Sequence, residues 1–337
     1  MFRKQGKEKK EMSGKKIDRA KMDLYAEKAK NWGKWGPNDE LGTVNYITPQ
    51  DIVAAAHLVK RGKVFSLAMP FGSEGPQFGD KGRINPVKTM IATGTDAICG
   101  RQDAIRIRYS DDMVTMPTQS ATHWDALGHI FFEKRNEKGE RKVYMWNGYS
   151  AENVNCSGCE KCGIQNYKDK MIGRGILLDM ARYKGVEAMA PGEGITGEDL
   201  DNCAKKFNVK VKRGDFVLVR TGQLGKHLKS GVWEQYAAGD APGLEFETVT
   251  WLHDKEVAGI STDTWGVEVR PNRSDEFHQP WHWLAIPILG IAMGEMFHLD
   301  ELAEDCAKDG VYEFLLAAPV IPFTNGAGSP VNPLAIK

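Results

Sequence analysis

Apolar residues recur at helical spacing in four segments, each bounded by residues that start or stop helices. These segments are 48–62, 195–207, 244–256 and 299–310. Thr48 is the predicted N-cap of the first, with Pro49 at its first helical position and Gly62 as its end. Thr196 has the same capping role in the second, and Gly310 ends the fourth. The pattern therefore predicts helices distributed along the whole chain.

Short apolar and β-branched runs between these segments predict strands. The runs are 63–69, 104–109, 175–180, 215–222, 257–262, 283–293 and 312–323. Several are apolar throughout, which is typical of strands buried on both faces. Strands and helices mix without a strict βαβ rhythm, and no shift in composition marks a domain boundary. We expect a single α/β domain with a mixed sheet and flanking helices.

The start of the chain has a different character. Residues 1–20 are polar and lysine-rich, with no apolar stretch of the kind found in secretory signals. We expect a solvated tail there, before a domain over 21–337; the alternative is an arm that docks on an anionic surface or a neighbouring subunit. No apolar run approaches the roughly 18–20 residues that span a bilayer. A cytoplasmic location with reduced thiols follows.

Composition narrows the choice of partner. Of 337 residues, 45 are basic and 45 acidic, so the formal net charge is zero. This balance argues against nucleic acid as the main partner. Hydrophobic residues make up 41% and charged residues 27%, which is ordinary for a soluble globular protein. We expect a small-molecule substrate, with no nucleic acid and no membrane as partner.

Three of the six cysteines, Cys156, Cys159 and Cys162, form a C-x2-C-x2-C run. Such spacing is compatible with zinc or an iron–sulfur cluster, but those sites normally use four ligands, and no fourth cysteine lies nearby. The surrounding residues are rich in Gly, Asn and Lys. We expect a polar surface insertion near 153–166, with a metal cluster as the alternative.

The stretch "TQSATHWDALGH" (118–129) concentrates polar side chains. Gln119, His123, Asp125 and His129 are all odd-numbered, so an extended strand would place them on one face. Imidazole, carboxylate and amide groups are suitable ligands for Zn²⁺ or Mn²⁺. A polar strand end with hydrogen-bonded side chains is the alternative. The residues alone leave both interpretations open.

The same stretch carries a family resemblance. "QSATHWDALGH" resembles the H-x-G-T-H-x-D-x-x-x-H signature of the metal-dependent cyclase family, which includes bacterial kynurenine formamidase and isatin hydrolase. "KRGDFVLVRTG", "WHWLAIPILGIAMGEMFHLDELAE" and "GSPVNPLAIK" resemble later segments of that family in matching order. The resemblance extends from about residue 32 to residue 337, nearly the whole chain.

The resemblance implies a set of site residues. Its two metal-binding histidines fall on Gln119 and His123, its metal-binding aspartate on Asp125, and its catalytic histidine on His129. Gln119 departs from the family, because an amide oxygen ligates a hard cation but is a weaker donor to zinc than imidazole. This departure shifts the expected ion from zinc toward manganese, or removes Gln119 from the ligands.

The later segment supplies His282 and Glu295, which the resemblance implies as acid–base groups or a further ligand. His278 is a rival for the role of His282. The alternative for His282 is a buried, hydrogen-bonded histidine between two tryptophans. We interpret Arg220 and Thr221, which end a predicted strand, as structural hydrogen bonders.

The resemblance implies a swivelling β/β/α fold, a homodimer or homotetramer, and a metal-dependent hydrolase. Water on a Mn²⁺ or Zn²⁺ ion would attack an amide, lactam or lactone in a cyclic or aryl molecule, with His129 as general acid and base. Aromatic candidates for the pocket are Trp124, Phe131, Phe132, Trp265, Trp281 and Trp283. The alternatives are a metal-dependent cyclase or isomerase, or a metal-free binding protein.

Overall fold

A nine-stranded mixed sheet forms the centre of the protein, whose computed structural model describes residues 16–135 and 138–337. Its strands, in spatial order, are β1 (Val64–Ser66), β17 (Leu334–Ile336), β15 (Glu313–Ala317), β9 (Ile172–Asp179), β11 (Phe216–Arg220), β13 (Gly259–Thr262), β14 (Ala292–Glu295), β4 (His123–Asp125) and β16 (Gly328–Pro330). The four strands β9, β11, β13 and β14 run parallel. The remaining pairs are antiparallel. The predicted mixed α/β sheet is confirmed.

Helices flank this sheet. The longer ones are α1 (Arg19–Ala29), α2 (Pro49–Ala56), α5 (Gly197–Lys206), α6 (Gln223–Ser230), α7 (Thr248–Asp254) and α9 (Asp300–Asp309), and the shorter ones are α3 (Gly94–Ile98), α4 (Met180–Lys184) and α8 (His282–Leu284). Helix α2 packs on β9 and β15, α5 packs on β9, and α4 packs on β11. Central strands covered in this way read as continuous apolar runs, and Phe216–Val219 of β11 are fully buried.

The predicted capping is confirmed. Thr48 and Thr196 each accept a hydrogen bond from the backbone N–H three residues on, and each forms a reciprocal capping box. Gly310 ends α9 in the left-handed conformation at φ 72°, which glycine adopts without strain. Helix α2 ends at Ala56, earlier than the predicted stop at Gly62.

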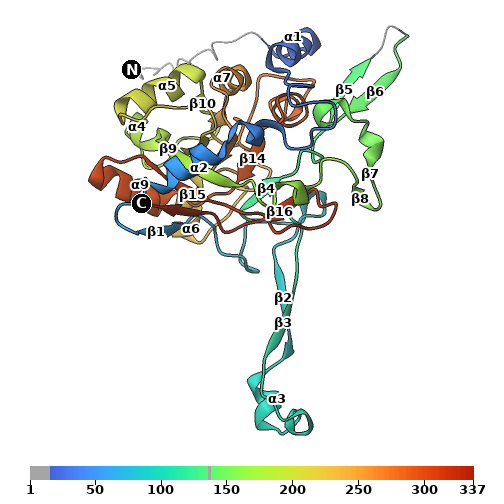
Figure 1. Ribbon diagram of the computed structural model, residues 1–337, viewed down its shortest axis with the longest axis vertical. Coiled ribbons are helices and arrows are strands. Elements are labelled where there is room, and N and C mark those ends of the chain that lie inside the picture. Colours follow the sequence, from blue (N-terminus) through green and yellow to red (C-terminus); the bar gives the residue numbers. More distant parts are fainter. Residues whose placement is uncertain (1–15, 136–137) are drawn as a thin grey trace, which may run out of the picture.

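Four small two-stranded units lie outside the main sheet. They pair β2 (Val87–Ala92) with β3 (Asp111–Thr115), β5 (Phe132–Arg135) with β6 (Arg141–Tyr144), β7 (Val154–Asn155) with β8 (Gly158–Cys159), and β10 (Gly194–Ile195) with β12 (Gly243–Leu244). Single 3₁₀ turns cover Gly42–Tyr46, Asp80–Gly82, Asp103–Ile105, Trp146–Gly148, Ala151–Asn153 and Ile164–Tyr167. The pair β2–β3, with α3 at its end, projects from the body as a long arm (Figure 1).

Two predicted strands are wrong. Residues 104–109 contain a 3₁₀ turn and Arg106 at φ 56°, and the strand of this region is β3, a few residues later. Most of the predicted run 283–293 forms the end of α8 and a π-helix over Ala285–Leu289, and only its last two residues belong to β14. All five residues of the π-helix are buried, and a helix buried on every side has the same unbroken apolar pattern as a doubly buried strand.

The described structure begins at residue 16, within the segment that we expected to be a tail. Residues 1–15 of the predicted tail are outside the described part of the chain. Ile17 is buried, its N–H donates to the Arg273 carbonyl, and α1 begins at Arg19. Among the described residues, no helix has the length and apolar character needed to cross a membrane.

Candidate metal centre

Strand pairing brings three candidate residues to one point. In the antiparallel register of β4 and β14, His123 lies opposite Glu295, and Asp125 lies opposite Met293. Side chains alternate along a strand, so His123 and Asp125 share a face while Trp124 points to the other and is fully buried. Directly opposed residues also share a face, which adds Glu295 to the group.

The ligand atoms of these three residues all lie within 4.8 Å of one another. His123 Nε2 is 3.4 Å from Asp125 Oδ1 and 3.3 Å from Glu295 Oε2. All three side chains are buried, with at most 5% of any one exposed. One nitrogen and several carboxylate oxygens at this separation could hold a divalent ion between them.

Two buried atoms of the group have no hydrogen-bond partner, namely His123 Nε2 and Asp125 Oδ1. The other ring nitrogen, His123 Nδ1, lies 2.7 Å from the Ala121 carbonyl oxygen and donates to it. This hydrogen bond fixes the tautomer, so Nε2 keeps its lone pair and points into the group. Buried polar atoms without a partner are costly in a folded protein. The donor set therefore fits a metal ion.

The charges at the centre also indicate a site for a metal ion. Burial alone would lower the pKa of His123, but the nearby carboxylates of Asp125 and Glu295 raise that pKa to about 9. Burial would raise the pKa of Asp125, yet the nearby His129 and His123 hold it well below its ordinary value. The carboxylates thus attract positive charge, which protons on histidine supply when no cation is bound.

His282 contacts Glu295 from outside the group of His123, Asp125 and Glu295. Its Nδ1 is 2.5 Å from Glu268 Oε1, and its Nε2 is 3.2 Å from Glu295 Oε1. Burial would lower the pKa of His282, but hydrogen bonds to Glu268 and Glu295 raise it to about 10. The rival His278 is exposed and contacts Arg270 instead. His282 therefore orients Glu295, and Glu268 is a functional candidate that no sequence pattern indicated.

His129 lies in the turn after β4, with Nε2 3.8 Å from Asp125 Oδ1. Its side chain is 21% exposed, whereas those of His123 and Asp125 are at most 2% exposed. Burial and the charge of Arg83 lower its pKa, and Asp125 opposes them without reversing the direction. A histidine that is neutral, close to the group and open to solvent can accept and release protons.

The cysteine segment supports this turn, and two of its three cysteines do not lie at the surface, where we expected them. Cys159 and Cys162 are buried, and only Cys156 is exposed. The Gly128 N–H donates to the Cys162 carbonyl, which ties the segment to the residue before His129. A side chain at Gly128 would stand only 3.0 Å from the Cys159 sulfur. The composition of the segment, rich in Gly, Asn and Lys, did not indicate that two of its thiols are packed in the interior.

The predicted single strand face does not extend to all four residues of the opening motif. Strand β4 covers only residues 123–125, and turns precede and follow it. Gln119 Oε1 accepts a hydrogen bond from the Thr118 hydroxyl at 2.9 Å, and its Nε2 donates to the Ala327 carbonyl at 3.2 Å. The role of Gln119 as a ligand stays a prediction.

Two further features surround the centre. Arg83 acts electrostatically on both Asp125 and His129, which makes it a cationic neighbour that the sequence did not reveal. The six aromatic candidates divide into buried side chains (Trp124, Phe132, Trp265 and Trp281) and half-buried ones (Phe131 and Trp283). All six pack in hydrophobic clusters, so their aromatic rings fill the core.

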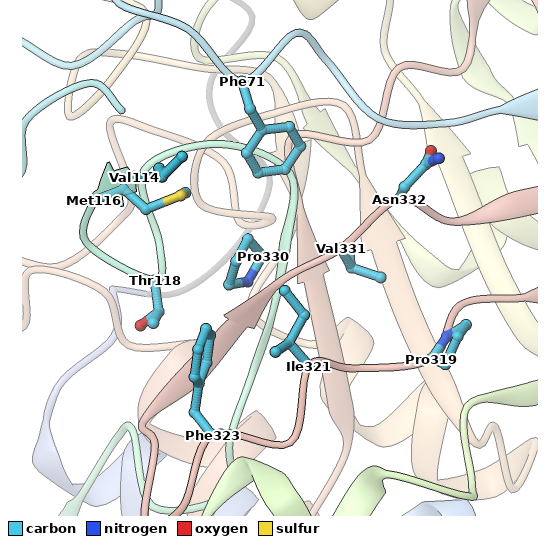
Figure 2. Close-up of a pocket in the computed structure, with 10 residues that line it drawn as sticks. All are labelled: Phe71, Val114, Met116, Thr118, Pro319, Ile321, Phe323, Pro330, Val331 and Asn332. Carbon is cyan, nitrogen blue, oxygen red and sulfur yellow. The ribbon is translucent and has the colours of Figure 1, made fainter. Parts of the chain in front are cut away.

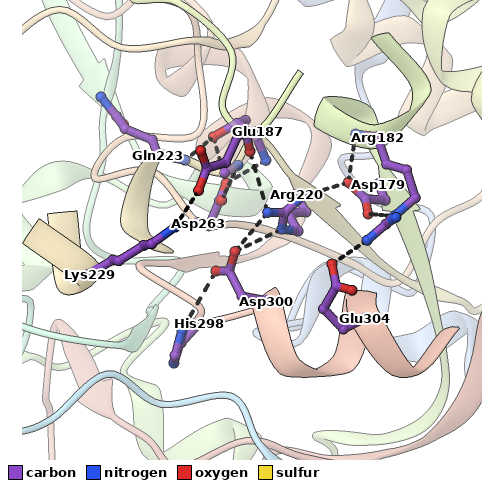
Figure 3. Close-up of polar contacts among 12 residues, drawn as sticks. Asp179, Arg182, Glu187, Arg220, Gln223, Lys229, Asp263, His298, Asp300 and Glu304 are labelled. Atoms are coloured by element: carbon purple, nitrogen blue, oxygen red, sulfur yellow. Dashed lines mark hydrogen bonds and ion pairs between the residues drawn. The ribbon is translucent and has the colours of Figure 1, made fainter. Parts of the chain in front are cut away.

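A second buried polar cluster lies at the ends of the parallel strands (Figure 3). Arg220 donates to Asp179 at 2.9 Å and to Asp300 at 2.7 Å. Asp263 accepts from the Thr221 hydroxyl and N–H, both at 2.7 Å, and from the Gly222 N–H at 2.6 Å. These contacts agree with the structural role expected for Arg220 and Thr221.

Comparison with known protein families shows the class to which this protein belongs. The model of the Cyclase family matches residues 65–269, more than half of the chain. The chain belongs to the cyclase family. No sequence among curated proteins matches it.

Several solved structures are similar to this chain. A crystal structure described as a novel cyclase is 37% identical, covers 93% of this chain and 99% of its own, and superposes with a TM-score of 0.81. An isatin hydrolase bound to the product analogue thioisatinate is 14% identical, covers 86% of this chain and 98% of its own, and has a TM-score of 0.56. Isatin hydrolase A from Ralstonia solanacearum is 17% identical, with coverages of 86% and 98% and a TM-score of 0.58. The likeness to the two hydrolases shows a shared fold.

Proposed function

We propose that this protein is a metal-dependent hydrolase that cleaves a C–N or C–O acyl bond, in an amide, lactam or lactone. The observation that carries this proposal is the pair of unpartnered buried atoms, His123 Nε2 and Asp125 Oδ1, aimed into a group rich in carboxylates. Family membership and the fold shared with isatin hydrolases support it. We assign His123, Asp125 and Glu295 as the ligands of one Mn²⁺ or Zn²⁺ ion.

When bound, such an ion lowers the pKa of a water molecule and polarises the carbonyl of the substrate. The residues of this chain supply the remaining requirements. His123 is held in one tautomer by the Ala121 carbonyl, and Glu295 is held by His282, which is itself held by Glu268. The donor atoms are thereby fixed before substrate arrives, which reduces the reorganisation needed for reaction.

His129 is the proposed general acid and base. It lies close enough to Asp125 to face the same space, and it is the member of the group most open to solvent. It can take the proton of the attacking water and return it to the leaving nitrogen or oxygen. Groups in this role contribute roughly 10²–10⁴ in rate.

The proposed substrate class rests on the charge that acyl-bond hydrolysis produces and on analogy with hydrolases of the same fold. Hydrolysis of an acyl bond produces a carboxylate, and Arg83 contributes positive charge that acts on both Asp125 and His129. A cyclic or aryl amide, lactam or lactone remains the proposed class, by analogy with the isatin hydrolases of the same fold. The aromatic side chains add little support for this class, because four of the six candidates are buried in the core and only Phe131 and Trp283 are half-buried.

Two measurements test the proposal. Protein purified without chelators should contain about one divalent ion per chain, as expected for a single set of buried ligands. Turnover of N-formyl-aryl amines, isatin-like lactams or unsaturated lactones in ¹⁸O-water should place solvent oxygen in the product carboxylate. A metal-dependent conversion without ¹⁸O would instead indicate a cyclase or isomerase. Protein without any ion, and without activity after Mn²⁺ or Zn²⁺ is added, would indicate a binding protein.

A further inference from the structure

Two arginines of this chain are half-buried and have no acidic partner. Among the described residues, every arginine except Arg83, Arg106 and Arg270 forms an ion pair with a carboxylate. Arg106 lies near the tip of the β2–β3 arm and is exposed, so water solvates its charge. Arg83 and Arg270 are half-buried, where water solvates a charge less completely. The protein therefore holds two guanidinium groups partly out of water without a carboxylate to balance them.

A loop of residues 70–86 is fastened to the stretch that leads into β4. Directly before the loop, the Met69 N–H donates to the Thr122 hydroxyl at 2.9 Å. Within the loop, Gln77 Nε2 donates to the Ser120 carbonyl at 3.0 Å. Both acceptors lie just before the metal-binding strand. The loop is therefore held beside that strand at two points.

The same loop is closed on itself by Asn85. Its Oδ1 accepts from the Gln77 N–H at 2.8 Å, and its Nδ2 donates to the carbonyls of Ser73, Gly75 and Gln77 at 3.1, 3.0 and 3.1 Å. A side chain at Gly75 would stand only 2.5 Å from Asn85 Oδ1, so the close approach needs glycine. Arg83 lies two residues before Asn85, and its backbone is thus fixed before any ligand binds, which lowers the entropic cost of binding.

The charges of this loop reach the solvent side of the metal centre. Arg83 acts electrostatically on Asp125 and on His129, and His129 is the member of the centre most open to solvent. Lys81, in the same turn as Arg83, acts electrostatically on His278. The loop therefore brings positive charge to the part of the centre that water reaches.

Arg270 approaches the centre from a different element. It follows Glu268, which holds His282, by two residues, and its Nη1 lies 2.9 Å from His278 Nε2. Its Nε is buried and has no hydrogen-bond partner. Its guanidinium lies over the Trp265 ring, 5.9 Å from the centroid. Arg270 and the loop of residues 70–86 thus both lie near His278.

An apolar groove of about 730 Å³ also begins at this loop, where Phe71 lines it together with Ile321, Phe323 and Pro330 (Figure 2). None of its lining side chains carries a charge. An anion would lose water in the groove without gaining a partner. Of these two features, the pair of arginines is the one that fits an anion.

We propose that Arg83 and Arg270 form an anion-binding subsite on the solvent side of the metal centre, and that the substrate is an amide, lactam or lactone that also carries a carboxylate. This inference rests on the proposed hydrolase function and narrows its substrate class. A planar guanidinium matches a carboxylate through two parallel hydrogen bonds. The subsite binds a carboxylate that is present before the reaction and is separate from the bond that is cleaved.

Charge favours a carboxylate over a phosphate as the group that is bound. The subsite lies near two acidic side chains, Asp125 at the centre and Asp80 in the turn before Arg83. A phosphate monoester carries a charge of about −1.5 to −2 at pH 7, so these side chains repel it more strongly than a single negative charge.

Turnover of matched substrates tests the subsite. The ortho, meta and para isomers of N-formyl-aminobenzoate and the corresponding neutral N-formyl-aminobenzamides present the same formyl bond and differ in charge. For the Mn²⁺-loaded full chain, we expect kcat/KM for at least one benzoate to exceed that of its benzamide by roughly 10–100-fold, the value of a hydrogen bond to a charged group. Arg83→Gln and Arg270→Gln should each reduce this ratio toward one. Arg106→Gln is the matched control and should keep the ratio, since Arg106 is exposed on the arm.

A binding measurement separates this inference from the proposed activity. Benzenedicarboxylates offer one carboxylate to the ion and a second to the subsite, and the matching carbamoylbenzoates lack the second charge. Isothermal titration calorimetry of Mn²⁺-loaded protein should show tighter binding of a dicarboxylate, and this difference should shrink in Arg83→Gln and Arg270→Gln but persist in Arg106→Gln. If that difference is found while no formyl substrate is turned over, the subsite stands and the proposed reaction falls.

The opposite results would overturn the subsite. Equal turnover of charged and neutral substrates, with equal binding of the two kinds of probe, would leave a hydrolase without an anion subsite. A preference for the anion that survives in both arginine variants would assign the second carboxylate to the metal ion. Tighter Mn²⁺ binding by Arg83→Gln, with the preference unchanged, would show that Arg83 only balances the carboxylates of the centre.

Discussion

Two buried polar clusters of this protein contain similar residues and differ in how their charges are satisfied. Around Arg220, the carboxylates Asp179 and Asp300 each receive a guanidinium N–H, and Asp263 accepts three hydrogen bonds from Thr221 and Gly222. Around His123, the carboxylates Asp125 and Glu295 face a histidine whose Nε2 donates to no atom. The first cluster holds a fold together, and the second has the composition of an ion site.

Burial and carboxylate content alone therefore do not distinguish the two clusters. Asp263 is buried as completely as His123, and burial raises its pKa to about 6. The discriminating feature is the absence of an arginine or lysine ion pair at Asp125 and Glu295 among the described residues. Unpartnered buried atoms occur in both clusters, at Asp300 Oδ2 in the first and at His123 Nε2 and Asp125 Oδ1 in the second. An excess of negative charge that the protein does not balance itself indicates a missing cation.

The largest effect should come from Asp125→Asn, which keeps the size of the side chain and removes its charge. We expect ion content to fall from about one per chain to near zero, with a loss of turnover greater than the roughly 10–100-fold that even an outer partner costs. The melting temperature of chelated protein should not fall, because the ion-free centre already holds excess negative charge. Elemental analysis and calorimetry check both points, and full ion content would show that the site is misplaced.

His129→Ala should retain the ion and lose roughly 10²–10⁴ of turnover, the usual value of a positioned acid–base group. His129→Asn should behave in nearly the same way, because an amide hydrogen-bonds water but does not carry its proton away. Steady-state kinetics with parallel metal analysis separate the two roles. Loss of the ion would make His129 a ligand and move the base to His282 or Glu295.

The sequence allowed much of this centre to be predicted because its residues follow local rules. His123 and Asp125 lie two residues apart on one strand, the family signature added His129, and a later segment that resembles the family added Glu295. It did not indicate Glu268, which follows β13 in an irregular segment and reaches His282 only through the fold. Arg83 was missed for the same reason, since its loop approaches the centre in space alone.

The fold shows the same division between local and non-local information. Thr48, Thr196 and Gly310 were identified correctly, because capping depends on neighbouring residues. Residues 285–289 were predicted as strand but form a π-helix. The prediction failed because a completely buried segment is apolar throughout and has no periodicity that distinguishes a helix from a strand. The alternation of Ile105 and Ile107 with arginines also suggested a strand, but this segment lies at the tip of the arm, where no sheet pairs with it.

Arg220→Met should affect stability and leave the ion in place. Removal of one partner from a buried ion pair costs about 3–5 kcal/mol, because the fully buried Asp179 loses one of its two guanidinium partners. Asp300 is 28% exposed, so water replaces part of the contact that it loses. Urea unfolding measures this change, and ion content per folded chain should not differ from wild type. Arg182→Met is the matched control: Arg182 also pairs with Asp179 but is partly exposed, so its loss should cost about 1 kcal/mol or less. An Arg220 variant as stable as wild type would erase the distinction between the clusters.

Glu268→Gln tests how far the ion site extends beyond its ligands. The substitution removes the charge that holds the Nδ1 proton of His282, and an outer partner of this kind is worth roughly 10–100-fold in metal affinity or activity. His278→Ala is the control, since His278 is exposed and contacts Arg270. Metal titration and kinetics should show the loss for Glu268→Gln alone. Equal behaviour of the two variants would reduce the His282–Glu268 pair to packing.

The smallest effect concerns Gln119, which has features of both a structural polar residue and a metal ligand. Its amide is satisfied by Thr118 and Ala327, as in a structural residue, yet it occupies the position of a metal-binding histidine in the family signature. We expect Gln119→His to raise zinc affinity more than manganese affinity, because imidazole is the better donor to a borderline ion. The gain should stay below the roughly 10–100-fold value of an outer partner, since three other buried residues are the proposed ligands of the ion. Competition with a chromophoric chelator measures both affinities, and Thr118→Val, which releases the amide oxygen without adding imidazole, is the control. Unchanged affinity for both ions in Gln119→His would place residue 119 outside the ligands and leave His123, Asp125 and Glu295 as the whole set that this chain supplies.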